Sequence, residues 1–209
     1  MLAAACDALR TARPDVLLLG GDFVSLTHHG IDWLADLLAT IPAPFGRFAV
    51  LGNHDYWNGA KYVIGALEAV GIEVLTNRNR RLEPPFEEVW VCGLDDFVSG
   101  MPDATSALAG ADGVRLVLMH SPSNLLSLGP ARFDLALCGH THGGQIALPS
   151  GRALLGAPGP LSKVYNRGRF EVGHAGTLLV SVGLGCSTLP IRWNATAEVL
   201  VCRIGADSV

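Results

Sequence analysis

Hydrophobic residues recur along the chain in two patterns, short continuous runs and longer amphipathic segments. Six short runs are typical of strands, at residues 16–20, 47–51, 72–76, 88–93, 114–119 and 133–138. Four amphipathic segments predict helices, near residues 30–40, 60–70, 103–109 and 122–128. Because strands that alternate with helices form layered α/β domains, the first two thirds of the chain predict a largely parallel sheet.

The pattern changes in the last third, where Gly and Pro become frequent across 149–160. Beyond them, residues 169–173, 177–182 and 197–204 are typical of strands joined by turns. Such a series predicts an antiparallel or mixed second sheet. Two sheets with helices outside them would enclose one core, so we expect a single domain over residues 1–209.

The first residues have a helical pattern of their own. Leu2, Ala5 and Leu9 recur at helical spacing until Pro14 ends the pattern. A chain that begins inside a helix favours a further segment upstream of Met1. The first residues lack the basic and apolar regions of a signal peptide, and no run of the sequence is long enough to span a bilayer.

Composition narrows the class of protein. Of the 209 residues, 49% are hydrophobic and only 16% are charged, which argues against a disordered chain. The net charge of -4 argues against a nucleic-acid partner, because duplex binding relies on clustered Lys and Arg. The five cysteines are odd in number and lie mostly in apolar runs, which favours reduced core thiols in a cytoplasmic protein.

Polar residues directly follow four of the predicted strands. Asp22 comes after the first run, and Asn53, His54 and Asp55 come after the second. His120 follows the run at 114–119, and the sequence Gly139-His140-Thr141-His142 follows the run at 133–138. Because the carboxyl ends of parallel strands meet at one edge of a sheet, these side chains are expected to converge there.

The chemistry of these side chains fits a pair of divalent cations that bind a phosphate between them. Asp22 would supply a bridging carboxylate, Asn53 an amide oxygen, and three histidines the nitrogen ligands, His120, His140 and His142. His54 would donate a proton to the leaving oxygen, and Asp55 would help to fix its orientation.

Each motif also has a structural interpretation. A Gly-Asp after a strand is usually a turn, Asn-His-Asp often caps a helix, and a lone histidine is often a hydrogen-bonded structural residue. Their common place at strand ends favours a functional site. Tyr56 and Trp57 are either packing residues or the mouth of a pocket. Seven basic residues have two interpretations, a surface that binds a phosphate or a lipid headgroup, and ordinary charge exposed to solvent. They are Arg78, Arg80, Arg81, Lys163, Arg167, Arg169 and Arg192.

In this order the motifs resemble the calcineurin-like metallophosphoesterases, from about residue 12 to the end of the chain. The C-terminal part is most similar to a bacterial, often membrane-associated subgroup that includes UDP-diacylglucosamine pyrophosphatases. The resemblance implies a four-layer αββα sandwich of two mixed β-sheets flanked by helices. It also implies that Asp22 bridges the two metals, that His142 holds the first, and that His54 is the catalytic histidine. The second metal would be held by Asn53, His120 and His140.

The chain departs from that family at its beginning. The family opens with a strand that ends in Asp-x-His, and no such motif precedes Asp22. The first metal would then keep only Asp22 and His142, too few ligands for tight binding. Truncation of an active enzyme is the favoured explanation, and it predicts an upstream strand that ends in Asp-x-His. A degenerate relative and replacement ligands such as His28 or His29 are the alternatives.

We therefore expect a metal-dependent phosphoesterase that hydrolyses a phosphodiester, phosphomonoester or pyrophosphate bond with a metal-activated hydroxide. Its cofactors would be two divalent ions, Mn, Fe, Zn or Mg, with Mn favoured. The substrate would be a small-molecule or lipid-linked phosphate ester, with peripheral contact at the inner membrane as an open alternative. The rival hypothesis is a degenerate phosphate- or metal-binding domain without turnover, and a nuclease is disfavoured.

Overall fold

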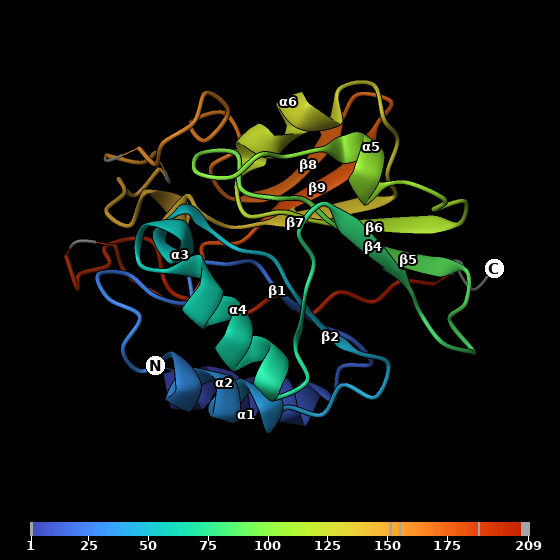
Figure 1. The fold of residues 1–209 in the computed structure, drawn as a ribbon. Coiled ribbons are helices and arrows are strands. Elements are labelled where there is room, and N and C mark those ends of the chain that lie inside the picture. The colour runs from blue at the N-terminus through green and yellow to red at the C-terminus, as the bar shows by residue number, and fades with distance from the viewer. Residues whose placement is uncertain (1, 151, 155, 188, 206–209) are drawn as a thin grey trace.

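The structure is a computed structural model that describes residues 2–150, 152–154, 156–187 and 189–205. Its elements stack in four layers, with helices outside two facing sheets (Figure 1). Three helices cover the first sheet, α1 (Leu2–Ala12), α2 (Ile31–Ala39) and α4 (Ala60–Ala69). Two short helices cover the second, α5 (Ala104–Ala107) and α6 (Leu125–Leu128), which continues from a 3-10 turn, η1 (Pro122–Asn124).

The first sheet is parallel, in the order β1-β2-β3. Its strands are short, β1 (Leu17–Leu19), β2 (Arg47–Ala49) and β3 (Glu73–Val74). Successive side chains of a strand point to opposite faces, so Leu17 packs towards the helices while Leu18 packs towards the other sheet. Ala35 of α2 and Val63 of α4 are fully buried against the helix-facing side.

The second sheet is mixed, in the order β4-β5-β6-β7-β9-β8. Its strands are β4 (Arg78–Arg81), β5 (Val89–Gly93), β6 (Val114–Leu118), β7 (Leu135–Cys138), β8 (Gly168–Val172) and β9 (Gly176–Val180). The four central strands, β5, β6, β7 and β9, run parallel, while β4 and β8 pair antiparallel at the edges. The carboxyl ends of the parallel strands therefore share one edge.

A separate hydrophobic cluster joins the two sheets. Phe48, Val50 and Leu75 from the first sheet region pack with Val91 and Leu118 of the second. The three clusters of buried residues thus correspond to the three interfaces between the four layers. This arrangement confirms the predicted αββα fold class, and it places the loops after both sets of strands close together.

Most predicted elements are present, within a few residues of their expected bounds. The boundary between the sheets was placed too late in the chain, because the second sheet already begins at β4. The prediction of a strand at 197–204 is wrong, since the structure assigns no strand there. Leu200, Val201 and Ile204 are largely exposed, which shows that apolar β-forming residues need a paired sheet edge to become a strand.

The basic run at 78–81 forms the edge strand β4, which its charged sequence did not predict. Charged side chains are common on edge strands because they discourage pairing with other chains. Arg80 forms an ion pair with the Glu73 carboxylate at 2.7 Å, so part of the positive charge of β4 is paired with β3 of the first sheet. None of the helices in the described ranges is both long and apolar enough to cross a membrane.

Candidate metal centre

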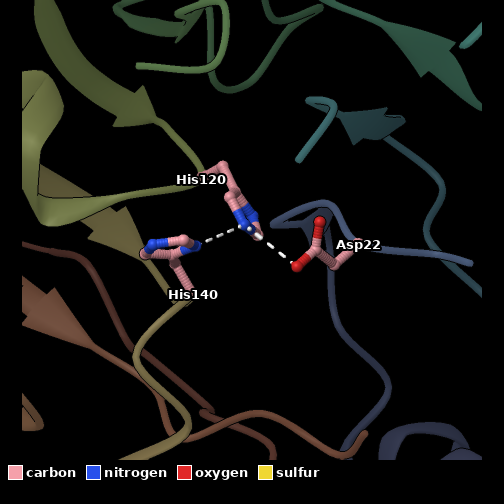
Figure 2. Close-up of side chains that lie close together, drawn as sticks. All are labelled: Asp22, His120 and His140. Atoms are coloured by element: carbon pink, nitrogen blue, oxygen red, sulfur yellow. Dashed lines mark hydrogen bonds and ion pairs between the residues drawn. The ribbon is translucent and has the colours of Figure 1, made fainter. Parts of the chain in front are cut away.

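Three predicted ligands meet where the two sheets face each other, and not at the edge of one sheet as the sequence predicted, because β1 belongs to a different sheet from β6 and β7. Asp22 follows β1 of the first sheet, and His120 and His140 follow β6 and β7 of the second (Figure 2). The Asp22 Oδ2 atom lies 3.2 Å from His120 Nε2, and His140 Nδ1 lies 3.0 Å from the same nitrogen. One ligand atom from each residue lies within 4.8 Å of the other two, close enough for all three to bind one cation.

The hydrogen bonds around His120 identify its protonation state. Its Nδ1 atom lies 2.7 Å from the Gly20 carbonyl oxygen and so donates a proton there. Although burial disfavours a charged ring, the Asp22 carboxylate raises the pKa of His120 to about 9. Without metal the ring is therefore an imidazolium at neutral pH. Its Nε2 proton points at Asp22 and His140, in the place where a cation would bind.

His140 complements this arrangement as a neutral ring. Its Nε2 atom donates to the Pro158 carbonyl oxygen at 2.9 Å, which leaves Nδ1 as an acceptor facing His120. Burial, together with the charge on His120, lowers the pKa of His140 to about 4. A carbonyl that fixes the far nitrogen of a metal-binding histidine orients the other nitrogen, whose lone pair is free in His140 and would become free in His120 once a metal ion displaces its proton.

Two further predicted ligands have buried atoms without partners. Asn53 is 1% exposed, and its Oδ1 atom accepts no hydrogen bond from the described residues. His142 Nδ1 is likewise buried and without a partner among them. Leaving a buried polar atom unsatisfied costs about 1–3 kcal/mol, so these atoms fit groups that a bound ion would satisfy. The donor set of carboxylate, amide oxygen and imidazole also suits a divalent cation.

The backbone around these ligands is strained and tightly packed. Asp22, His140 and His142 have positive φ angles of 56°, 66° and 52°, a conformation that costs residues other than glycine about 1 kcal/mol or more. A Cβ atom at Gly52 would lie 2.1 Å from Asp22 Oδ1. Another at Gly21, whose φ is 89°, would lie 2.5 Å from the Gly52 nitrogen. Both glycines are needed for the close approach of β1 and β2.

Asp55 organises the backbone of the site. Its Oδ2 atom accepts hydrogen bonds from the Asp22 and Gly52 amides at 2.8 and 2.9 Å, and its Oδ1 atom accepts one from Val24 at 3.2 Å. Burial of the carboxylate raises its pKa to about 6. These hydrogen bonds fix the backbone at Asp22, whereas the His54 ring is oriented by the Ser25 carbonyl oxygen and not by Asp55. A catalytic part for Asp55 stays a prediction.

His54 lies beside the metal ligands and outside their cluster. Its backbone amide donates to Asp22 Oδ1 at 2.9 Å, which ties its position to that ligand. The ring Nδ1 lies 3.0 Å from the Ser25 carbonyl oxygen, and Nε2 lies 3.4 Å from Ser187 Oγ. Trp57 packs against the ring with centroids 4.9 Å apart and remains 58% exposed. This placement leaves the predicted proton donor available, and its role stays a prediction.

His28, one of the two alternative ligands, makes its contacts elsewhere. His28 stacks on Tyr62 with centroids 4.5 Å apart, and its Nδ1 atom lies 3.2 Å from the Asn58 carbonyl oxygen.

Arg192, which the sequence offered as part of a phosphate surface, donates instead to the backbone carbonyls of Val182, Gly185 and Ala195. It thereby fixes the C-terminal segment beside the loop that carries His142.

Two buried acids at the same edge were missed from the sequence. Asp95 and Asp96 follow β5, in the same position relative to their strand as the predicted ligands. Asp96 is fully buried, and its Oδ2 atom accepts bonds from the Val98 and Ser99 amides at 2.9 and 2.6 Å. The signal that could have found them is the pair of carboxylates just after the hydrophobic run at 88–93.

Comparison with known proteins identifies a family to which the sequence is similar. The family model described as calcineurin-like phosphoesterase matches residues 2–144. The uncharacterized metallophosphoesterase YkuE of Bacillus subtilis (strain 168) is 30% identical over 201 residues, which cover 92% of this chain and 68% of YkuE. The phosphodiesterase YaeI of Escherichia coli (strain K12) is 36% identical over 199 residues, which cover 92% of this chain and 71% of YaeI.

A solved structure shows the same fold. The Haemophilus influenzae NAD nucleotidase superimposes with a TM-score of 0.52 at 15% sequence identity. The match covers 93% of this chain and 39% of that protein. At this identity the likeness concerns the fold alone, and it supports the two-sheet architecture in which the ligands converge.

Proposed function

The chain belongs to the calcineurin-like phosphoesterase family, and we propose that it hydrolyses phosphoester or pyrophosphate bonds with two divalent metal ions. Membership of the family implies a metal-dependent phosphoesterase, and the kind of bond that this enzyme cleaves is our proposal. A phosphodiester is the first candidate, because the YaeI relative carries the name phosphodiesterase. Phosphomonoesters and pyrophosphates are the other candidates, as small-molecule or lipid-linked substrates.

The convergence of Asp22, His120 and His140 is the observation that carries the proposal. These residues come from three separate strand ends in two sheets, and their ligand atoms lie within one small volume. The unpartnered Asn53 oxygen adds a fourth donor from a further strand end. Because the chain matches the phosphoesterase family model and a relative that carries the name phosphodiesterase, the non-catalytic alternative is not favoured.

Each side chain has a distinct proposed part. Asn53, His120 and His140 would hold one ion, with Mn favoured. Asp22 would share its carboxylate with the other ion, which His142 also binds and which these two ligands would hold more weakly. Bound divalent ions would activate a water for attack and neutralise charge on the phosphate. His54 would protonate the leaving oxygen from Nε2, because its Nδ1 atom is held by the Ser25 carbonyl. Trp57 would line the leaving-group side of the site.

The first test separates metal binding from fold. We expect His140→Ala to lose most of the Mn²⁺ that the parent binds in a calorimetric titration, because it removes one of the three convergent nitrogen and oxygen donors. His174→Ala is the matched control, since that histidine is exposed in the turn between β8 and β9. Equal Mn²⁺ binding by the parent and His140→Ala would contradict the ligand assignment.

The second test separates chemistry from binding. We expect His54→Ala to retain Mn²⁺ and to lose about 10²- to 10⁴-fold in turnover, because a proton donor acts on the leaving group. The loss should be smaller for p-nitrophenyl esters, whose leaving group needs less protonation. Loss of metal together with turnover would make His54 a ligand, and a parent that binds Mn²⁺ but cleaves no tested ester would favour the non-catalytic alternative.

A further inference from the structure

The proposed metal centre is assembled from two separate sheets, so their relative placement must be fixed near the site. Asn53 and His54 lie on the short helix α3 (Asn53–Trp57), which follows β2 of the first sheet. His120 and His140 follow strands of the second sheet. A helix of five residues has few hydrogen bonds of its own, so side-chain contacts must hold it in place.

Tyr56 makes such a contact. Its ring packs against the hydrophobic cluster between the first sheet and its helices. Its hydroxyl group reaches the second sheet, where it donates to Asp95 Oδ1, just beyond the end of β5. The donor is three residues from Asn53 on the same helix, so this bond links the amide ligand to the sheet that carries both histidine ligands.

Asp95 is itself held in a fixed position. Its Oδ1 atom also accepts from the Asp96 amide at 2.8 Å, and its Oδ2 atom accepts from the Met101 amide at 2.8 Å. Its backbone nitrogen donates to Asn77 Oδ1 at 3.0 Å, and its backbone oxygen accepts from Asn124 Nδ2 at 2.7 Å. An acceptor with so many bonds cannot follow Tyr56 if the helix shifts.

The packing around the carboxylate confirms how closely it is enclosed. A Cβ atom at Gly100 would lie 2.4 Å from Asp95 Oδ1 and 2.6 Å from Oδ2. Asp95 is only 7% exposed. A hydrogen bond to a buried carboxylate is stronger than one between neutral groups, so the Tyr56 contact is able to hold a short helix in register.

We propose that Tyr56 and Asp95 are positioning residues for the metal centre. Their hydrogen bond holds α3 against the second sheet, and it thereby keeps the Asn53 oxygen in range of an ion bound by Asp22, His120 and His140. This inference rests on the proposed metal site. It assigns a function to Tyr56 and Asp95 that neither the ligand motifs nor the fold family supplies.

The test is the Mn²⁺ affinity of Tyr56→Phe, which removes the hydroxyl group and keeps the ring in the core. We expect the affinity to fall about three- to tenfold, the loss that corresponds to one such hydrogen bond. Asn79→Ala is the control, because Asn79 Nδ2 also joins two elements, donating to the carbonyls of Ala107 and Ala109 far from α3. The control should lose thermal stability without losing Mn²⁺ affinity.

A double-mutant cycle tests whether the bond acts through Asn53. If Tyr56 positions Asn53, then Asn53→Ala should reduce Mn²⁺ affinity at least about threefold less in the Tyr56→Phe background than in the parent. Asp95→Asn serves as a second perturbation of the same bond. Independent effects, or unchanged affinity in both Tyr56→Phe and Asp95→Asn, would overturn the inference. A parent that binds no Mn²⁺ would instead refute the proposed metal site.

Discussion

Gly52→Ala is a sharp test of the packed metal centre, because it adds a single methyl group beside two ligands. The φ and ψ angles of Gly52 are -104° and 174°, an extended conformation that alanine adopts freely. The backbone therefore gives no reason for a loss of function. The new Cβ atom would lie 2.1 Å from Asp22 Oδ1 and 2.6 Å from His120 Cε1.

The size of the effect follows from these distances. Real Cβ contacts essentially never fall below 3.0 Å, so the Cβ atom and the Asp22 oxygen must separate by at least 3.0 − 2.1 = 0.9 Å, and by 3.4 − 2.1 = 1.3 Å to reach ordinary van der Waals contact. Metal–ligand distances tolerate deviations of only about 0.2 Å, so we expect at least about a 100-fold loss of Mn²⁺ affinity. Overpacking by one methyl costs about 1–3 kcal/mol, which lowers the melting temperature of a domain of this size by about 2–12 °C.

Calorimetric titration with Mn²⁺ and thermal unfolding measure the two effects separately. Gly20→Ala is the matched control, because a Cβ atom there meets nothing within 4 Å although Gly20 accepts the His120 Nδ1 proton. We expect the control to keep the parent's affinity and to change stability by no more than about 0.5 kcal/mol. Parental affinity in Gly52→Ala, or an equal loss in Gly20→Ala, would refute the close approach of Asp22 and His120.

Two further predictions use other properties of the structure. Because the pKa of His120 is raised to about 9 in the metal-free protein, Mn²⁺ must displace a proton at pH 7, and Mn²⁺ affinity should rise about tenfold per pH unit up to that value. Calorimetric titrations in buffers of different ionisation enthalpy should show the release of about one proton. No proton would be released if the ring were already neutral. Cys202 is exposed and Cys92 is fully buried, and burial raises the pKa of both thiols, that of Cys92 to about 11. A thiol reagent at pH 8 should therefore modify Cys202 in the folded protein and Cys92 only on unfolding, and mass spectrometry of the labelled peptides would detect the reverse order.

The raised pKa of His120 also predicts how stability depends on pH without metal. The folded protein binds the His120 proton more tightly than the unfolded chain, whose ordinary pKa is 6.5. The ion pair with Asp22 therefore contributes its full stability below about pH 6.5 and loses it as the pH rises through about 9. A bound divalent ion would take over the same position and remove this dependence.

Local patterns were sufficient to find the strands and the polar residues that end them. Four hydrophobic runs that form strands, β1, β2, β6 and β7, are each followed by a predicted ligand, because a buried strand must be apolar and its carboxyl end must leave the core. Parallel pairing of β6 and β7 brings His120 and His140 to one edge of the second sheet, whereas Asp22 reaches them because the first sheet faces the second. The motifs alone therefore predicted which residues converge, and the packing of the two sheets decided how they meet.

Other features depend on contacts that are distant in sequence. The run at 78–81 is a strand because β5 offers it a partner, and residues 197–204 are not a strand although their composition favours one. In the sequence Asp95 resembles an ordinary turn residue, and only the structure reveals that Tyr56 of α3, which follows the other sheet, donates to it. A local sequence pattern cannot predict these pairings, because each depends on which distant part of the chain the fold places beside the residue.

The sequence by itself determined the fold class and the ligand types, since both depend on periodicity and on side-chain chemistry. Only the tertiary structure decided the charge on the ligands. His120 and His140 have the same side chain and similar burial, yet the pKa of one is raised to about 9 and that of the other is lowered to about 4. The difference arises because the carboxylate of Asp22 lies against one ring, and the charge of that ring opposes a second charge on its neighbour.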